Sequence, residues 1–201
     1  MPFWSTNFGE DATLKDPKRQ FRFYVEFQGI NAAQGGAVLW YAKTAAKPSF
    51  TVEAVQHNYL NHVFNYPGKV TWGDVTVTLV DPVEPDMAAT LADILVQSGY
   101  SPPTDATTDS MGSISKAKAA AALGTVVITQ IDSDGGELEK WTLWNSFITD
   151  VKFGDSLQYG TDDLTEMSVT LKYDWARIET NSDNGGSVLV AGDGGNEFFS
   201  I

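Results

Sequence analysis

The sequence predicts a mainly β domain with one α-helix near its middle and a second, shorter helix after it. Apolar and polar residues alternate with a period of two over 69–81 and 164–178, which is typical of strands with one buried face. The 201 residues include 11 Phe, 7 Tyr and 6 Trp, and aromatic residues favour strands and anchor protein interfaces. Helical spacing of apolar residues is clear only after residue 86.

The N-terminal part is expected to be an arm followed by two paired strands. Residues 1–19 contain a few apolar residues among polar ones, so they have no local core to join and should be extended. The period of two over Phe21–Gln28 predicts a half-buried strand. We expect Gly29–Gly36 to turn the chain, Val38–Thr44 to return as the partner strand, and 50–58 to be extended.

The middle of the chain is expected to contain a long loop, a strand and a helix. His57–Lys69 lacks periodicity and contains Tyr66-Pro67-Gly68, a turn signature, so a loop of functional length is predicted there. Lys69–Asp81 then alternates cleanly, which predicts a strand. The helix after it should be opened by Pro85 and ended by Gly99.

The second half is expected to add a short helix, a hairpin and one long strand. Ser113–Leu123 is Ala-rich and precedes a glycine, which favours a short helix. Thr125–Ile131 and Leu138–Phe147 flank a turn sequence and should pair. Leu164–Ile178 alternates throughout, so it is predicted to be a single strand.

Composition indicates one globular domain with two appendages. The residues divide into an N-terminal arm over 1–19, a β domain over 20–179, and a Gly-rich, flexible extension over 180–201. The chain has no cysteine, which excludes disulfides and thiolate metal sites. With no signal peptide pattern and no run of 18 apolar residues, we expect a protein made in a cytoplasm and not inserted in a membrane.

No catalytic, cofactor or metal site is expected. The only histidines, His57 and His62, are five residues apart and have no further soft ligands nearby. Asp132-Ser133-Asp134-Gly135 is similar to the start of an EF-hand loop but lacks its later ligands, so a hairpin turn is the better interpretation. Neither phosphate-binding glycine pattern is present. The net charge of −13 disfavours binding to nucleic acid through phosphates.

The order of these elements resembles a known family. The local matches are Trp72-Gly-Asp74-Val-Thr-Val-Thr78, and the run from Leu157-Gln158-Tyr159 through Leu171-Lys-Tyr-Asp-Trp175. Over about residues 15–178 the chain resembles the tail tube proteins of contractile-tailed bacteriophages, whose fold is shared with the tubes of contractile injection systems. The N-terminal arm, the Ala-rich segment and the C-terminal extension are not matched to features of this family.

The resemblance implies a two-sheet β-sandwich or barrel with a flanking helix. It also implies a homohexameric ring in which the strands of six subunits join into one continuous inner barrel with a polar lining. Pairing the strand edges in a ring would remove them from solvent, and an acidic wall would let DNA pass without holding it. The candidates for lumen-facing residues are Thr76, Thr78, Glu166, Ser168 and Thr170.

Contacts between stacked rings are expected on the N-terminal arm and on the predicted loop His57–Lys69. Apolar residues on such segments need a partner surface. The candidates are Phe3, Trp4, Phe8, His57, Tyr59, His62, Phe64 and Tyr66.

The function implied is that of a structural virion protein, a tail tube for DNA ejection. Further partners implied are a tail sheath, a baseplate or initiator complex, and a tail terminator, with tail assembly in the host cytoplasm. Two alternatives stay open: the tube of a contractile injection system that carries protein effectors, and a carbohydrate-binding β-sandwich that uses aromatic residues to stack on sugars. A hydrolase ranks last, since no catalytic site can be identified.

Overall fold

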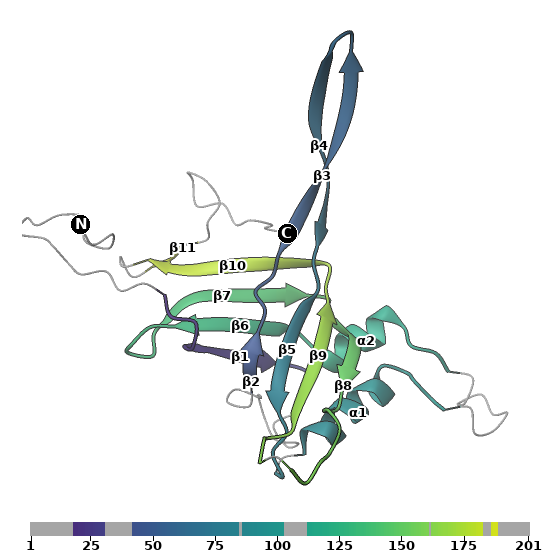
Figure 1. Cartoon of the computed structure of the whole chain (residues 1–201), viewed down its shortest axis with the longest axis vertical. Helices are drawn as coiled ribbons and strands as arrows, with labels where there is room; N and C mark the ends of the chain where they lie inside the picture. Colours follow the sequence, from purple (N-terminus) through teal and green to yellow (C-terminus); the bar gives the residue numbers. More distant parts are fainter. Residues whose placement is uncertain are drawn as a thin grey trace, which may run out of the picture.

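The computed structural model describes residues 18–30, 42–84, 86–102, 112–160, 162–182 and 186–188. Within them, two antiparallel sheets and a separate hairpin carry most of the fold (Figure 1). One sheet has the order β1-β6-β7-β10-β11 and the other has the order β2-β5-β9-β8, while β3 and β4 form a two-stranded sheet. The strands are β1 (Phe23–Phe27), β2 (Ala42–Ala45), β3 (Phe50–Tyr59), β4 (His62–Trp72), β5 (Val75–Val80), β6 (Val126–Ile131), β7 (Glu137–Trp144), β8 (Phe147–Lys152), β9 (Glu166–Lys172), β10 (Trp175–Ser182) and β11 (Gly186–Val188).

The core lies between the two sheets and under the first helix, α1 (Met87–Gln97). In strand β5, Val75, Val77 and Leu79 are fully buried, while the residues that alternate with them are not. The buried cluster joins both sheets and α1, with members that include Val25, Phe27, Val75, Val77, Leu79, Met87, Leu91, Ile94, Val126, Ile128, Leu143, Met167, Val169 and Leu171. This arrangement is a β-sandwich, so the mainly β, two-sheet fold is confirmed.

Both helices form where the sequence predicts them. Asp86 caps α1 by accepting a hydrogen bond from the Ala89 backbone N–H at 2.9 Å. Gly99, with φ +100°, donates to the Val96 carbonyl and lets the helix end in a Schellman motif. Pro85 lies outside the described residues. The second helix, α2 (Lys116–Leu123), has Ser115 as its N-cap. In the described part of the chain, neither helix has the length and hydropathy that a membrane span needs.

Three predictions about strands are wrong. Strand β1 does not pair with the strand after it, because it pairs with β6 while β2 pairs with β5 in the other sheet. The segment His57–Lys69 is not a loop but the distal part of the β3–β4 hairpin. Leu164–Ile178 is not one strand, because the chain leaves one sheet after β9 and enters the other at β10.

A corner of the sandwich explains the third error. The chain passes between the sheets twice at the same place, at Asn145-Ser146 and at Tyr173-Asp174. Asp174 accepts hydrogen bonds from Lys116 and Asn145, at 2.7 Å and 2.9 Å. These hydrogen bonds hold the pKa of Asp174 below its usual value. Strand β9 therefore ends at a corner where Asp174 makes polar contacts with distant residues. The alternation of apolar and polar residues over 164–178 does not indicate these contacts.

The predicted C-terminal boundary falls inside a strand. Strand β10 ends at Ser182, three residues past the predicted boundary at position 179. It pairs with β11. The residues beyond Val188 lie outside the described residues, so the flexibility expected for the rest of the extension stays a prediction.

The end of β1 meets the end of α2 at a close approach of two backbones, where we expect Gly29→Ala to destabilise the fold. A Cβ atom on Gly29 would lie 2.4 Å from the carbonyl carbon of Leu123, so the junction would have to open. We expect a loss of about 2 kcal/mol in the free energy of unfolding, measured by chemical denaturation. The control is Gly160→Ala, where an added Cβ meets nothing within 4 Å. An equal effect of both substitutions would contradict this account.

Candidate functional site

The β3–β4 hairpin, hereafter the arm, extends away from the body of the molecule (Figure 1). Every residue of β3, and every residue of β4 except Trp72, is exposed. Isolated two-stranded hairpins are only marginally stable in water, and this one also carries large apolar side chains in solvent. They are Phe50, Val52, Val55, Tyr59, Leu60, Val63, Phe64, Tyr66 and Val70. Such a surface makes the hairpin a candidate interaction site.

The arm has one aromatic face in its outer half. Residues that lie directly opposite each other in an antiparallel pair share a face, and the pairs Val55–Tyr66, His57–Phe64 and Tyr59–His62 alternate with more polar pairs on the other face. The rings of His62 and Phe64 contact each other edge to face, with centroids 4.8 Å apart. All five candidates from the predicted loop, His57, Tyr59, His62, Phe64 and Tyr66, therefore lie together on this aromatic face.

Two backbone features shape the arm. Pro67 and Gly68 do not turn the chain: Pro67 pairs with Ala54, and Gly68 and Lys69 lie opposite Glu53 at a β-bulge, where the register shifts. The turn itself is at Leu60-Asn61. Leu60 adopts φ +52°, which is uncommon for a bulky residue, and its side chain is 89% exposed. A two-residue hairpin turn requires a positive φ at a central residue, so the turn accounts for this conformation and presents an apolar side chain at the tip of the arm.

The base of the arm is fixed to the body by contacts between inclined aromatic rings. Phe50 and Trp72 lie opposite each other with centroids 5.4 Å apart, and Trp72 packs on the buried ring of Tyr173 at 5.8 Å. The Gly73 backbone N–H also donates to the Ser49 carbonyl at 2.8 Å. In the part of the chain that the structure describes, the arm is therefore held to the body at its base.

A second surface is the polar face of the β2-β5-β9-β8 sheet, hereafter the wall face. The register places Thr76 opposite Thr170 and Thr78 opposite Ser168, while Glu166 lies opposite Val80 at the end of the same ladder. Each of these positions alternates with core residues. The five residues predicted to face a lumen therefore lie on the same side of two adjacent strands, opposite the core.

The wall face is balanced in charge. Glu166 pairs with Lys43, and Asp74 with Lys172 at 3.6 Å, while Asp150 and Lys152 lie on β8 in register with Thr170 and Ser168. The wall face thus carries three carboxylates and three lysines, together with the hydroxyl groups of Thr76, Thr78, Ser168 and Thr170. The net charge of −13 is not concentrated on this face, unlike the acidic wall that the sequence led us to expect.

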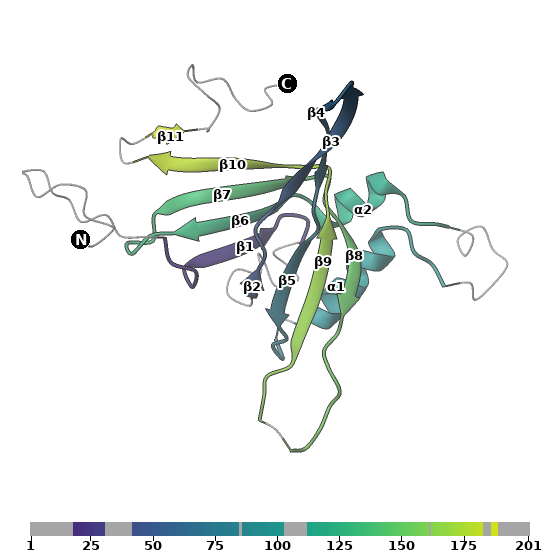
Figure 2. The same ribbon diagram turned by 45° about the horizontal axis from the view of Figure 1, so that its top comes forward.

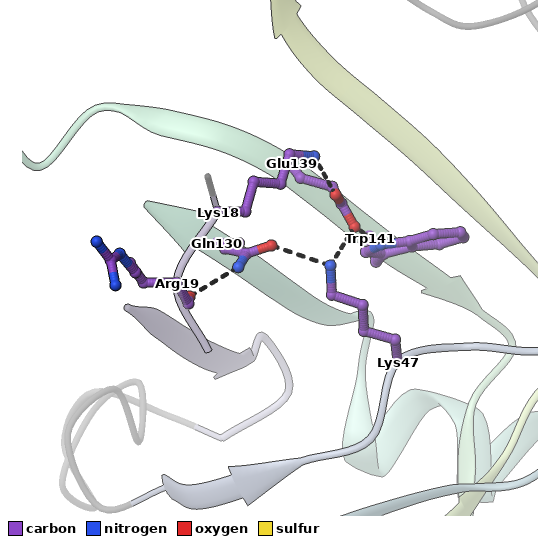
Figure 3. Close-up of polar contacts among 6 residues, drawn as sticks. All are labelled: Lys18, Arg19, Lys47, Gln130, Glu139 and Trp141. Atoms are coloured by element: carbon purple, nitrogen blue, oxygen red, sulfur yellow. Dashed lines mark hydrogen bonds and ion pairs between the residues drawn. The ribbon is translucent and has the colours of Figure 1, made fainter. Parts of the chain in front are cut away.

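The third feature is a buried carboxylate that the sequence did not indicate. Glu139 on β7 has an 8% exposed side chain and pairs with Lys18 and Lys47, the latter at 2.7 Å (Figure 3). The Trp141 indole Nε1–H donates to it at 2.5 Å. Burial acts to raise the pKa of Glu139, but the hydrogen bonds from the two lysines and the indole outweigh it and lower the pKa to about 2.

This cluster ties two chain segments to the five-stranded sheet. Lys47 also donates to Gln130 at 2.9 Å, and the Gln130 amide donates to the Arg19 carbonyl at 2.8 Å (Figure 3). Lys18 and Arg19 are the last two residues of the predicted N-terminal arm, and Lys47 lies between β2 and the hairpin arm. The cluster therefore holds both segments against the five-stranded sheet.

Some expected features cannot be placed. Phe3, Trp4 and Phe8 lie outside the described residues. Within the described residues, no group of three or more His, Asp or Glu side chains is arranged to hold a metal ion.

Comparison with known proteins supports the fold. Neither a scan of family models nor a search of curated proteins gave a match. Among solved structures, an extracellular contractile injection system, the PVC sheath–tube complex in the extended state, gives a TM-score of 0.59 at 14% identity, covering 84% of this chain and 95% of that chain. The PVC sheath/tube terminator gives 0.57 at 14% identity, covering 83% and 99%.

The baseplate structure of the anti-feeding prophage, solved with 6-fold symmetry, also gives a TM-score of 0.57, at 16% identity and covering 82% and 96%. At these identities the likeness concerns the fold alone. The chain has the tail-tube-like fold found in contractile injection systems, and the resemblance predicted from the sequence is confirmed at that level.

Proposed function

We propose that this chain is a non-catalytic structural protein, six copies of which form a ring, and that the rings stack into the inner tube of a contractile tail. Two surfaces carry the proposal, the arm and the wall face. Neither surface packs against the core of its own subunit, so both are available to contact other molecules. A tube explains both, because one surface contacts the next ring and the other lines the channel. The fold of the neighbouring structures and the 6-fold symmetry of the anti-feeding prophage baseplate support this proposal.

In the proposed tube, the aromatic face of the arm makes the contact between rings. Exposed aromatic side chains supply much of the binding energy in protein interfaces. Phe3, Trp4 and Phe8 of the N-terminal arm are proposed to add to this contact. The domain of residues 20–179 is proposed to form the ring, with 1–19 and 180–201 as its appendages.

The wall face is proposed to line the lumen through Thr76, Thr78, Glu166, Ser168 and Thr170. Hydroxyl groups stay hydrated and form no lasting contact with a passing molecule, and paired charges offer no net field. The lumen would therefore let its cargo slide without binding it.

For the cargo, we propose phage DNA, with the protein residing in the tail of a virion after assembly in the host cytoplasm. The sheath, initiator or baseplate, and terminator would be its partners. A second candidate, protein effectors delivered by an injection system, is favoured by the charge balance of the wall face, since proteins of either sign could pass. Electron microscopy of native particles separates the two, because a DNA tube joins a filled head and an injection system has none.

We expect the purified protein to form rings or hollow tubes with six-fold end views. Negative-stain electron microscopy over a concentration series is the measurement. Assembly should increase with concentration, because both proposed contacts are between copies. A particle that stays monomeric at every concentration, alone and with a tail initiator complex, would contradict the proposed function, and a screen for glycan binding would then test the sugar-binding alternative.

A further inference from the structure

A cavity of about 670 Å³ lies between β2 and the five-stranded sheet. Four apolar side chains that belong to the core or pack against it line this cavity: Phe23, Ala45, Ile128 and Trp141. Phe21, whose side chain is 74% exposed, lines it as well. The volume falls in the range of roughly 300–1,000 Å³ that bound molecules occupy, so the cavity is a candidate docking site with an apolar lining.

Three lysines line the same cavity: Lys18, Lys43 and Lys47. Within the described residues, each donates one or two hydrogen bonds through its ammonium group. An ammonium group can donate three, so each lysine keeps at least one N–H for a further acceptor. Segments 18–23 and 42–47 contain 5 of the chain's 13 lysines and arginines and no acidic residue. The cavity therefore favours an occupant that carries carboxylates.

The N-terminal segment of the chain has a composition that suits this cavity. Lys18 lines the cavity, and residues 1–17 come directly before it. In this segment, Phe8-Gly9-Glu10-Asp11 places an aromatic ring just before a pair of carboxylates. This order matches an apolar lining with ammonium groups beside it. Ten residues of extended chain span about 35 Å, so a ring at position 8 can reach back to a cavity that begins at Lys18.

Two other occupants have weaker support. The C-terminal run Glu197-Phe198-Phe199 also combines a carboxylate with aromatic rings. It follows β11, however, and Figure 2 shows β11 and β1 at opposite edges of the five-stranded sheet. A second copy of the chain would supply the N-terminal segment from solution, whereas a segment tethered at Lys18 acts at an effective concentration in the millimolar range, roughly. The chain's own N-terminal segment is therefore the favoured occupant.

We propose that residues 8–11 dock in the cavity of their own chain, with Phe8 on the apolar lining and the carboxylates of Glu10 and Asp11 on the three lysines. The docking is internal to one copy, so it goes beyond the proposed function and does not depend on it. In a tube, Phe3 and Trp4 would then start from a fixed point on the subunit when they contact the next ring. Phe8 would add to that contact by holding the segment in place.

Disulfide formation within one chain tests the docking, because the protein has no native cysteine. The full chain is studied below the concentration at which copies associate, with Asn7→Cys and Ala45→Cys combined. The control combines Asn7→Cys with Lys140→Cys, next to Glu139 on β7 but on the opposite face of the sheet. In a glutathione buffer, the effective concentration of the first pair of thiols should exceed that of the control pair by at least about tenfold. Equal values would overturn the docking, and thermal unfolding shows that both variants are folded.

The same assay separates the other two occupants. A variant with Ala45→Cys and Ser200→Cys places the second thiol beside the C-terminal aromatic rings. A higher effective concentration for this pair than for positions 7 and 45 would assign the cavity to the C-terminal run and overturn the proposal. The single variants Asn7→Cys and Ala45→Cys are also mixed. Covalent dimers in this mixture, in place of an internal disulfide in the double variant, would assign the cavity to a second copy and overturn the proposal as well.

Substitutions in the variant with cysteines at positions 7 and 45 identify the contacts. Phe8→Ser should lower the effective concentration about tenfold, because the aromatic ring leaves the apolar lining, whereas Phe3→Ser should leave it unchanged. Glu10→Gln together with Asp11→Asn should lower it and remove its dependence on salt. An equal loss with Phe3→Ser and Phe8→Ser would overturn the role of Phe8. An unchanged value after both carboxylates are neutralised would overturn the contact with the lysines.

Discussion

A variant with Tyr59→Ser, Phe64→Ser and Tyr66→Ser is expected to fold like the wild type and to lose its tubes. The three side chains are 63%, 43% and 55% exposed and lie on the aromatic face of the arm, so their removal should leave the sandwich core intact. As interface anchors they would contribute about 2 kcal/mol each. The affinity between rings should therefore fall on the order of a thousandfold or more, measured as tube length and sedimentation at a fixed concentration.

The opposite face of the arm provides a matched control. Gln56, Asn58 and Asn65 lie on the same two strands with their side chains on the other side. Replacing all three with Ser makes as many changes at the same distance from the body, and tubes should form as before. Thermal unfolding of both variants shows whether the body is intact. Tubes of normal length in the aromatic variant, or an equal loss in the control, would refute the proposed role of the aromatic face.

Elements whose signals are local were predictable from the sequence. Strand β5 alternates because each second residue is in the core, and α1 carries its own N-cap at Asp86 and its own stop at Gly99. The hairpin of β6 and β7 is likewise specified by a short turn, in which Asp132 accepts from two backbone N–H groups. In each case the signal and the structure it specifies lie within about 20 residues.

The pairing of distant strands was not predictable in this way. Strand β1 pairs with β6, about 100 residues later, because the sandwich places them together. The sequence of residues 23–27 does not indicate which strand will be the partner. The arm was missed because it has no buried face to impose alternation. Its Pro67-Gly68 pair indicates a break in regular pairing, which proved to be a bulge, whereas the real turn at Leu60-Asn61 has no glycine.

The candidate surfaces were partly predictable. Alternation was enough to group Thr76 with Thr78 and Glu166 with Ser168, and the structure adds that the two groups are neighbours. The charge balance of the wall face was hidden, because Lys43 and Glu166 are far apart in the sequence. The same holds for Glu139, whose two lysine partners lie 92 and 121 residues away.

Glu139→Gln is expected to lower the free energy of unfolding by about 2–3 kcal/mol near neutral pH. The pKa of Glu139 in the folded protein is about 2, against an ordinary value of 4.5, and a shift of this size corresponds to about 3 kcal/mol. The lysine side chains are about half exposed, so screening by water reduces that value. Glutamine keeps the size of the side chain and removes only the charge.

The pH dependence identifies the charge as the cause. Because the folded-state pKa is depressed, the stabilisation is fully present above about pH 4.5 and is lost as the pH falls towards 2. The difference in unfolding free energy between wild type and Glu139→Gln should therefore be largest near neutral pH and disappear at about pH 2. Glu137→Gln on the same strand is the control, since Glu137 is exposed and, within the described residues, accepts a side-chain hydrogen bond from Tyr24 alone. Its difference should stay within about 0.5 kcal/mol. A difference for Glu139→Gln that does not change between pH 7 and pH 2 would mean that Glu139 acts through packing. In that case the tie between the sheet and the two segments at Lys18 and Lys47 would not be electrostatic.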